Sequence, residues 1–269
     1  TFGTISYPGG RLPAPIRRPF RLLGLLALTR SWRLLPAALG MPGPERIGLS
    51  LGGSRYSLRT RPLRELWIDL GILWELAVAG VYPLPDTDEQ ISIVDVGAHR
   101  GHFVVWATAR LPGAEIHAYE PDDANAAELE RAVVLNRCSE RVTLHREAVA
   151  AREGTRRFMS DPRSDAGHLA TEGRAVPAVG LGTVISRCRT PRVYLKVDAE
   201  GAEHEAFAAL GADAPEAARR IVAVALEWHP PVSGETDVRR SLEALGFEVR
   251  SRMLGIGNGI VHAWPRGRA

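Results

Sequence analysis

Charged side chains are concentrated in one short stretch of the sequence, residues 195–203, which reads Leu-Lys-Val-Asp-Ala-Glu-Gly-Ala-Glu. Lys196 is followed there by three acids, Asp198, Glu200 and Glu203, at the end of an apolar run. Burying charges is costly unless they are paired, so such a cluster at the tip of a strand is more typical of a reactive site than of a folding element. We expect Asp198 or Glu200 to accept a proton and Lys196 to stabilise negative charge on an oxygen atom. The alternative is a structural ion pair between Lys196 and one of the acids.

A second group of reactive side chains lies at residues 226–231, which read Leu-Glu-Trp-His-Pro-Pro. The side chain of His229 titrates near neutrality, so it could act as a general base toward a hydroxyl group, with Glu227 orienting it. Together with Asp198 and Glu200, these residues would also offer an oxygen-rich site for Mg²⁺ or another divalent cation. The spacing matches no recognised metal motif, so we assign no metal ligands and keep the divalent cation as an alternative.

A glycine turn lies at residues 93–103, Ile-Val-Asp-Val-Gly-Ala-His-Arg-Gly-His-Phe. An apolar run ends near Asp95, Gly97 and Gly101 follow, and a helical pattern begins at once. A turn of this kind brings backbone N–H groups and a helix N-terminus to the edge of a parallel sheet. Gly97 allows the sharp turn, and Gly101 allows the helix to approach a ligand. The turn therefore predicts a cofactor site.

The type of cofactor is indicated by Glu120, which ends the next apolar run twenty-five residues after Asp95 and is followed by Pro121. An acid at the tip of the second strand can accept hydrogen bonds from both hydroxyls of a ribose, in NAD as well as in S-adenosylmethionine (SAM). Asp95 would repel the pyrophosphate of NAD. SAM has no phosphate and carries an amino group and a sulfonium. We therefore expect SAM, with an NAD-dependent dehydrogenase as the weaker alternative.

The elements that position these residues alternate between short strands and helices beyond residue 90. Strands are predicted at residues 91–96, 115–119, 141–146, 175–179, 192–198, 221–227, 246–250 and 259–264. Helices are predicted at residues 101–110, 122–136, 202–210 and 234–245. This alternation predicts an α/β fold with a doubly wound, Rossmann-like, mainly parallel sheet. Only a loop separates the final two strands, so the last strand should be antiparallel.

An arginine-rich N-terminal extension, residues 1–63, precedes a catalytic domain predicted at residues 64–269. We expect a helical stretch over residues 16–39 broken by Pro36, then a β-hairpin from Ile47–Leu51 and Arg55–Thr60. An amphipathic helix should follow from Pro62 to Ala79, because its apolar residues recur at intervals of three and four. Its tryptophans, Trp67 and Trp74, are expected in the core.

The positive charge of the chain is concentrated in this extension. Residues 1–64 hold eleven arginines and a single acid, Glu45, hence a net charge of +10, so with +3 for the whole chain the remainder carries −7. The basic excess therefore does not belong to the catalytic domain, and we do not expect a nucleic-acid partner. Peripheral contact of residues 11–35 with a membrane, or packing in a homo-oligomer, remains an alternative to packing on the chain's own domain. The two cysteines form no recognisable motif, and we expect a cytoplasmic protein.

The order of these motifs resembles that of the FkbM family of SAM-dependent methyltransferases. The resemblance covers residues 47–264, and its most specific string is LKVDAEGAE. It implies a methyltransferase sheet and SAM contacts from Asp95, Gly97, Ala98 and Gly101. It also implies a ribose contact from Glu120, adenine contacts near Glu147 and Ala148, and a methyl-transfer site lined by Lys196, Asp198 and Glu200. His99 stands where the family usually has Asn, and we expect it to donate a hydrogen bond near the SAM carboxylate.

The expected activity is therefore SAM-dependent O-methylation of a small hydroxyl-bearing acceptor, a sugar or a secondary metabolite. The candidate bases, in order, are Glu200, Asp198 and His229, and Glu227 and Lys196 assist them. One alternative is a nucleic-acid methyltransferase that grips phosphates through the extension. Another is a non-catalytic SAM-binding module that the extension anchors to a partner or to a membrane surface.

Overall fold

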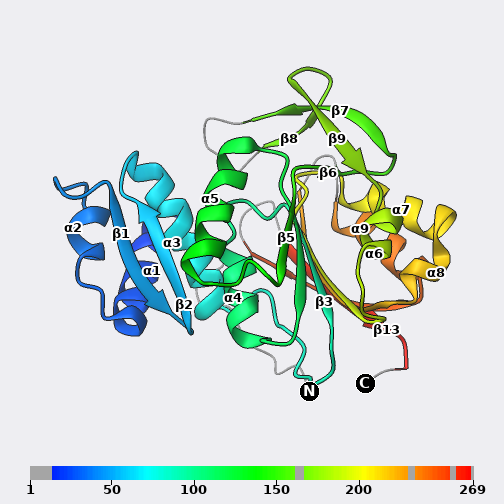
Figure 1. Ribbon diagram of the computed structural model, residues 1–269, viewed down its shortest axis with the longest axis horizontal. Helices are drawn as coiled ribbons and strands as arrows, with labels where there is room; N and C mark the ends of the chain where they lie inside the picture. The colour runs from blue at the N-terminus through cyan, green and yellow to red at the C-terminus, as the bar shows by residue number, and fades with distance from the viewer. Residues whose placement is uncertain (1–13, 161–166, 230–233, 255–258, 268–269) are drawn as a thin grey trace.

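The computed structural model describes residues 14–160, 167–229, 234–254 and 259–267, and a seven-stranded sheet lies at its centre (Figure 1). The sheet has the strand order β12-β13-β11-β10-β3-β4-β5. Its strands are β3 (Ser92–Val96), β4 (Glu115–Tyr119), β5 (Val142–His145), β10 (Val193–Val197), β11 (Ile221–Trp228), β12 (Phe247–Met253) and β13 (Gly259–Pro265). Only β13 runs antiparallel to its neighbours, β11 and β12. The doubly wound sheet with an antiparallel last strand is therefore confirmed.

Helices cover both faces of this sheet (Figure 1). On one face lie α4 (His102–Arg110) and α5 (Asp123–Leu135). On the other face lie α6 (Leu181–Ser186), α7 (Glu203–Asp213), α8 (Pro215–Ala218) and α9 (Glu235–Ala244). The four helices predicted beyond residue 100 are present, whereas α6 and α8 were not predicted, because each is too short to show a helical period.

The site-forming edge of the sheet lies where β3 and β10 meet. From β3 the chain continues through β4 and β5 to one side, and it then returns to β10 on the other side of β3. In such sheets ligands bind outside the carboxyl ends of the strands at the point where the strand order reverses. The β3–β10 register sets Lys196 directly beside Asp95.

A smaller sheet is inserted between β5 and α6, and Figure 1 shows it above the main one. Its strands are β6 (Ala148–Val149), β7 (Gly154–Met159), β8 (His168–Ala170) and β9 (Arg174–Val179), in the order β6-β9-β7-β8. The strand predicted at residues 175–179 thus forms, but in this second sheet. Most of β7 is solvent-exposed and only Phe158 is buried, so it lacks the apolar alternation that identifies a strand.

The extension contains α1 (Ala14–Thr29), α2 (Leu34–Ala38) and the hairpin of β1 (Arg46–Leu51) and β2 (Ser54–Arg59), and α3 (Leu63–Ala77) follows. The predicted break at Pro36 is wrong. Pro36 lies in the first turn of α2, where its missing N–H is not needed. The break comes at Arg30, which adopts a left-handed φ of 52°. The hydroxyl of Thr29 accepts a hydrogen bond from the backbone N–H of Ser31 at 3.2 Å and so closes α1.

The extension packs directly on the main sheet. Leu25 of α1, Leu34 of α2 and Leu66 of α3 are buried in the same apolar cluster as Ile93 of β3. The hydroxyl of Ser54 in β2 donates a hydrogen bond to the carbonyl oxygen of Val105 in α4 at 2.7 Å. These contacts fix α1 and α3 beside the carboxyl edge of the sheet, where they can form part of a site. The domain boundary at residue 63 stays a prediction.

Candidate active site

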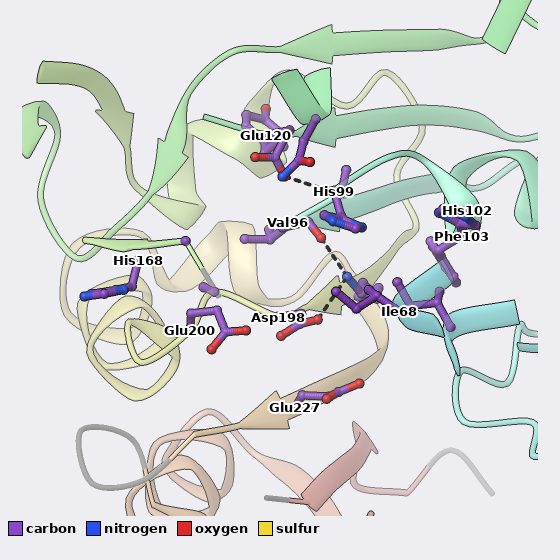
Figure 2. Close-up of a pocket in the computed structure, with 18 of the residues that line it drawn as sticks. Ile68, Val96, His99, His102, Phe103, Glu120, His168, Asp198, Glu200 and Glu227 are labelled. Atoms are coloured by element: carbon purple, nitrogen blue, oxygen red, sulfur yellow. Dashed lines mark hydrogen bonds and ion pairs between the residues drawn. The ribbon is translucent and has the colours of Figure 1, made fainter. Parts of the chain in front are cut away.

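A cavity of about 500 Å³ lies at the carboxyl ends of β3, β4, β10 and β11. The small sheet contributes Phe158 and His168 to its lining, and α1 and α3 form another wall. Figure 2 shows Glu120 and His99 on one side of the cavity and Asp198, Glu200 and Glu227 on the other. The cavity therefore joins the predicted cofactor residues to the predicted reactive ones.

Most of the site residues predicted from sequence line this cavity. The lining residues among them are Gly97, Ala98, His99, Glu120, Pro121, Glu147, Ala148, Lys196, Asp198, Glu200, Glu227 and His229. Two predicted cofactor residues, Asp95 and Gly101, are not in the lining. Their contacts with a cofactor stay a prediction.

Asp95 lies beneath the glycine turn and is completely buried. Its carboxylate forms an ion pair with Nζ of Lys196 at 3.1 Å, and the same ammonium donates a hydrogen bond to the carbonyl oxygen of Gly97 at 2.9 Å. Nζ also lies 3.7 Å from the carboxylate of Asp198. Burial alone would lower the pKa of Lys196, but Asp95 and Asp198 raise it above its ordinary value. The structural ion pair and the reactive cluster, which the sequence left as alternatives, are thus parts of one arrangement.

The two glycines of the turn have different functions. Gly97 has φ 72°, and a Cβ there would stand 1.9 Å from the carbonyl oxygen of Asp198, so this position excludes a side chain. Gly101 has φ 79° and precedes the first residue of α4. A Cβ at Gly101 would stand 2.8 Å from Leu129 of α5, so this glycine permits the packing of α4 against α5. Its approach to a ligand stays a prediction.

The carboxylate of Glu120 is buried at the tip of β4. It accepts hydrogen bonds from the backbone N–H groups of His99 at 2.7 Å and Asp122 at 2.8 Å. Burial raises its pKa to about 7 despite these donors. His99 has a left-handed φ of 51°, which aims its N–H at Glu120. The remaining lone pairs of this carboxylate could accept from the two hydroxyls of a ribose, and that contact stays a prediction.

His229, the last described residue before residues 230–233, is surrounded by acids. Its Nδ1 lies 3.1 Å from Glu203, and its Nε2 lies 3.6 Å from Asp198 and 3.8 Å from Glu200. Burial alone would lower the pKa of His229, but the hydrogen bond with Glu203 and the three negative charges raise it to about 10. The imidazole is therefore protonated at neutral pH, and this cation ties the three acids together.

Glu203 is the residue whose role the sequence did not reveal. It is completely buried at the start of α7 and accepts hydrogen bonds from the backbone N–H groups of Ala199 at 3.2 Å and Gly201 at 3.1 Å. These bonds hold the turn in which Glu200 has a left-handed φ of 51°. The sequence placed Glu203 in the acidic stretch of residues 195–203, but nothing in that stretch distinguished its structural role from that of Glu200.

Glu227 does not orient His229 as predicted, because that contact belongs to Glu203. The carboxylate of Glu227 accepts a hydrogen bond from the hydroxyl of Tyr82 instead. Burial, and then the charge of Asp198, raise the pKa of Glu227 well above its ordinary value. Asp198, Glu227 and His229 each offer a ligand atom within 4.8 Å of the others, which is close enough for a shared divalent cation. A histidine ligand must be neutral, so the cation could bind only after His229 loses its proton.

The wall formed by α1 and α3 was not predicted as part of the site. It contributes Arg18, Arg21, Arg64 and Trp67, with Glu75 as its acid. Arg21 is paired with Glu75 at 3.0 Å, whereas the guanidinium of Arg18 lies 5.4 Å from the ring centre of Trp67. Trp67 was expected in the core and is only partly buried. Cationic, aromatic and apolar groups thus face the acids across the cavity.

Residues 95–249 match the sequence profile of the methyltransferase FkbM domain. The chain belongs to the FkbM methyltransferase family. The match begins at the glycine turn and ends in β12, so it covers the sheet edge that forms the cavity. No curated protein matches this sequence.

Several solved structures have a related fold. One is a precorrin-6y C5,15-methyltransferase from Geobacter metallireducens, at 16% identity and a TM-score of 0.40, covering 66% of this chain and 82% of that one. An O-methyltransferase family protein from Burkholderia thailandensis has 12% identity and a TM-score of 0.43, covering 77% and 60%. A human methyltransferase 10 domain containing protein has 16% identity and a TM-score of 0.41, covering 90% and 97%. Family membership rests on the domain match, because likenesses this distant carry no further weight.

The FkbM site fits SAM, the methyl donor of such an enzyme. Its sheet side is rich in acids, among them Glu120, Asp198 and Glu200, which suit the ammonium and sulfonium of SAM and would repel a pyrophosphate. Gly97 and Ala98 present backbone rather than bulky side chains to the same space. Within the part of the chain that the structure describes, no helix is both long and apolar enough to cross a membrane.

Proposed function

We propose that this FkbM methyltransferase transfers a methyl group from SAM to a hydroxyl oxygen of a small-molecule acceptor. The observation that carries the proposal is the position of Asp198 and Glu200. They line the same cavity as Gly97 and Glu120, which mark its SAM side, and as the wall formed by α1 and α3. A hydroxyl held against that wall would reach these carboxylates, and its proton could leave to one of them.

SAM supplies an electrophilic methyl group on its sulfonium, and transfer to oxygen needs the acceptor held in line with it. Asp198 is well placed to take the hydroxyl proton, because its Oδ1 accepts no hydrogen bond from the described residues and lies 3.6 Å from the protonated His229. Glu200 is the second candidate. His229 is cationic at neutral pH, so we assign it to positioning the acids rather than to the base role. Lys196 keeps the glycine turn and Asp198 together.

A small acceptor is supported by the size of the site, a cavity of about 500 Å³. The cavity is covered by Phe158 and His168 of the small sheet and bounded by Trp67 and Ile68 of α3. Such a pocket suits a compact molecule that can insert one hydroxyl. Sugars and secondary metabolites with a free hydroxyl are therefore the acceptor classes we propose.

The test is a mass-spectrometric search for a product heavier by one CH₂ unit across sugar, polyketide and peptide acceptors. With any acceptor found, Asp198→Asn and Glu200→Gln should retain SAM binding in calorimetry, and at least one should lose turnover by about 10²–10⁴-fold, the usual contribution of a positioned base. Glu205→Gln is the matched control, since Glu205 is exposed on the first turn of α7. Full turnover in both site variants, or methylation at nitrogen or carbon, would contradict the proposal.

A further inference from the structure

The outer face of α1 and α2 exposes an unusual amount of apolar surface. Of the eleven large apolar side chains that are exposed among the described residues, seven fall between residues 20 and 41. We call these seven the α1–α2 patch: Phe20, Leu23, Leu28, Trp32, Leu35, Leu39 and Met41. Single exposed apolar residues are ordinary, but a concentration of them marks a surface that binds something.

Helix α1 is apolar on two opposite faces. Leu22, Leu25 and Leu26 are buried against the rest of the chain. Phe20, Leu23 and Ala27 are exposed and are spaced by three and four residues, so they form one line on the solvent side. A surface helix normally carries polar residues there, and one that is apolar all round is buried on all sides. The exposed line is therefore a contact face.

The charge around the α1–α2 patch has one sign. Arg30 and Arg33 are exposed, and neither forms an ion pair with another described residue. The sequence holds no acid between residues 14 and 44. Trp32, 71% exposed, lies between the two arginines. Its indole suits a boundary between apolar and aqueous phases.

We propose that the α1–α2 patch binds the surface of an anionic membrane. The arginines would meet lipid headgroups while Phe20, Leu23 and Trp32 enter the boundary between headgroups and acyl chains. A second copy of this chain is a poorer partner, because a symmetric contact would set arginine-bearing surfaces against each other with no acid to offset them. Figure 1 shows α1 and α2 at one end of the molecule, opposite α8, so a membrane can approach them.

This surface is coupled to the active site through α1. Arg18 and Arg21 of the same helix contribute to the cavity wall that faces the acids. Docking through α1 would therefore bring the acceptor side of the cavity close to the headgroups. The proposal stands independently of which acceptor is methylated.

The experiment is co-sedimentation of the full chain with vesicles of phosphatidylcholine alone or in equal mixture with phosphatidylglycerol. We expect binding to the anionic vesicles only, falling as salt is raised. Each arginine near such a surface changes affinity about fivefold, so R30Q/R33Q should bind about 25-fold more weakly. F20S/L23S should lose roughly tenfold or more per side chain.

The matched controls are R219Q/R240Q, which removes two exposed arginines elsewhere, and V134S, which removes a side chain 69% exposed on α5. Both should bind vesicles as the unaltered chain does, and thermal unfolding confirms that every variant is folded. Equal binding to neutral and anionic vesicles, binding unchanged in the patch variants, or no binding at all would overturn the proposal. A dimer that F20S/L23S dissociates, without vesicle binding, would assign the patch to a second copy instead.

Discussion

Replacing Glu203 with glutamine tests how the active site holds its charges. The substitution keeps the size of the side chain and an oxygen that can accept from the backbone N–H of Gly201, but it removes the negative charge 3.1 Å from Nδ1 of His229. Since that contact is the chief cause that raises the pKa of His229, the variant should release the imidazole proton at lower pH. Asp198 and Glu200 remain and should preserve part of the effect.

The size of the change follows from the contact. Raising the pKa of His229 from 6.5 to about 10 corresponds to about 5 kcal/mol at about 1.4 kcal/mol per unit. A hydrogen bond to a charged partner contributes about 1.5–3 kcal/mol, which is roughly one to two units. The midpoint in Glu203→Gln should therefore lie roughly between pH 8 and 9.

The stability of the fold should follow the same titration. A histidine with a raised pKa in the folded state adds stability that is fully present below pH 6.5 and is lost as the pH rises through about 10. Glu203→Gln should therefore be less stable than the unaltered chain near pH 6, with the deficit shrinking toward pH 10. Glu205→Gln, on the exposed side of the same helical turn, should match the unaltered chain throughout.

The assay is an NMR titration of the imidazole nitrogens, assigned by comparison with His229→Gln, alongside urea unfolding at several pH values. An unaltered chain that titrates near 6.5 would show that the acids do not hold the proton. A midpoint that Glu203→Gln leaves unchanged would show that Glu203 is not the controlling partner. Either result would refute the reasoning, and the first would also return His229 to the list of candidate bases.

Two further predictions concern the buried carboxylates of the cofactor side. Asp95→Asn and Lys196→Met should each destabilise the fold by about 3–5 kcal/mol, because each leaves the other buried charge without its partner. The double variant should lose clearly less stability than the sum of the two single variants. Additive losses in urea unfolding would show that the pair does not act as a unit. SAM affinity, measured by calorimetry, should rise with pH through about 7 as Glu120 ionises, and Glu120→Gln should bind more weakly without that dependence. Glu120 should also make the unliganded fold less stable as pH rises from 4.5 to about 7, so an unfolding profile flat over this range would contradict the raised pKa.

The main sheet could be predicted because its strands are buried on both faces. Such strands, like β3 and β10, are largely apolar apart from the paired Asp95 and Lys196, and they alternate with helical periods. The small sheet could not be predicted in this way. Its strand β7 is mostly exposed and lacks the apolar alternation of a strand, and the sequence signal of such a segment is that of a loop.

The site could be predicted as a set of residues but not as a set of contacts. Asp198, Glu200 and His229 were recognised because polar side chains at the carboxyl ends of parallel strands meet at one edge. Which acidic side chain pairs with His229 depends on the directions of the side chains, and the spacing of residues along the sequence does not determine these. Glu203 therefore takes the contact with His229 that the sequence assigned to Glu227. The cavity wall formed by α1 and α3 depends on how the N-terminal extension packs on the main sheet, and no local sequence pattern predicts that packing.

The charges of the site favour a cationic ligand for a reason that goes beyond simple attraction. Burial raises the pKa of Glu120 to about 7, and it raises that of Glu227 as well, so without a ligand these groups hold protons part of the time at neutral pH. A positive charge entering the cavity stabilises their ionised forms and promotes release of those protons. Binding of SAM would thereby restore the carboxylate that its own ribose requires. Loss of the proton from Glu227 would also add a negative charge beside Asp198, the residue proposed to receive the proton of an acceptor hydroxyl.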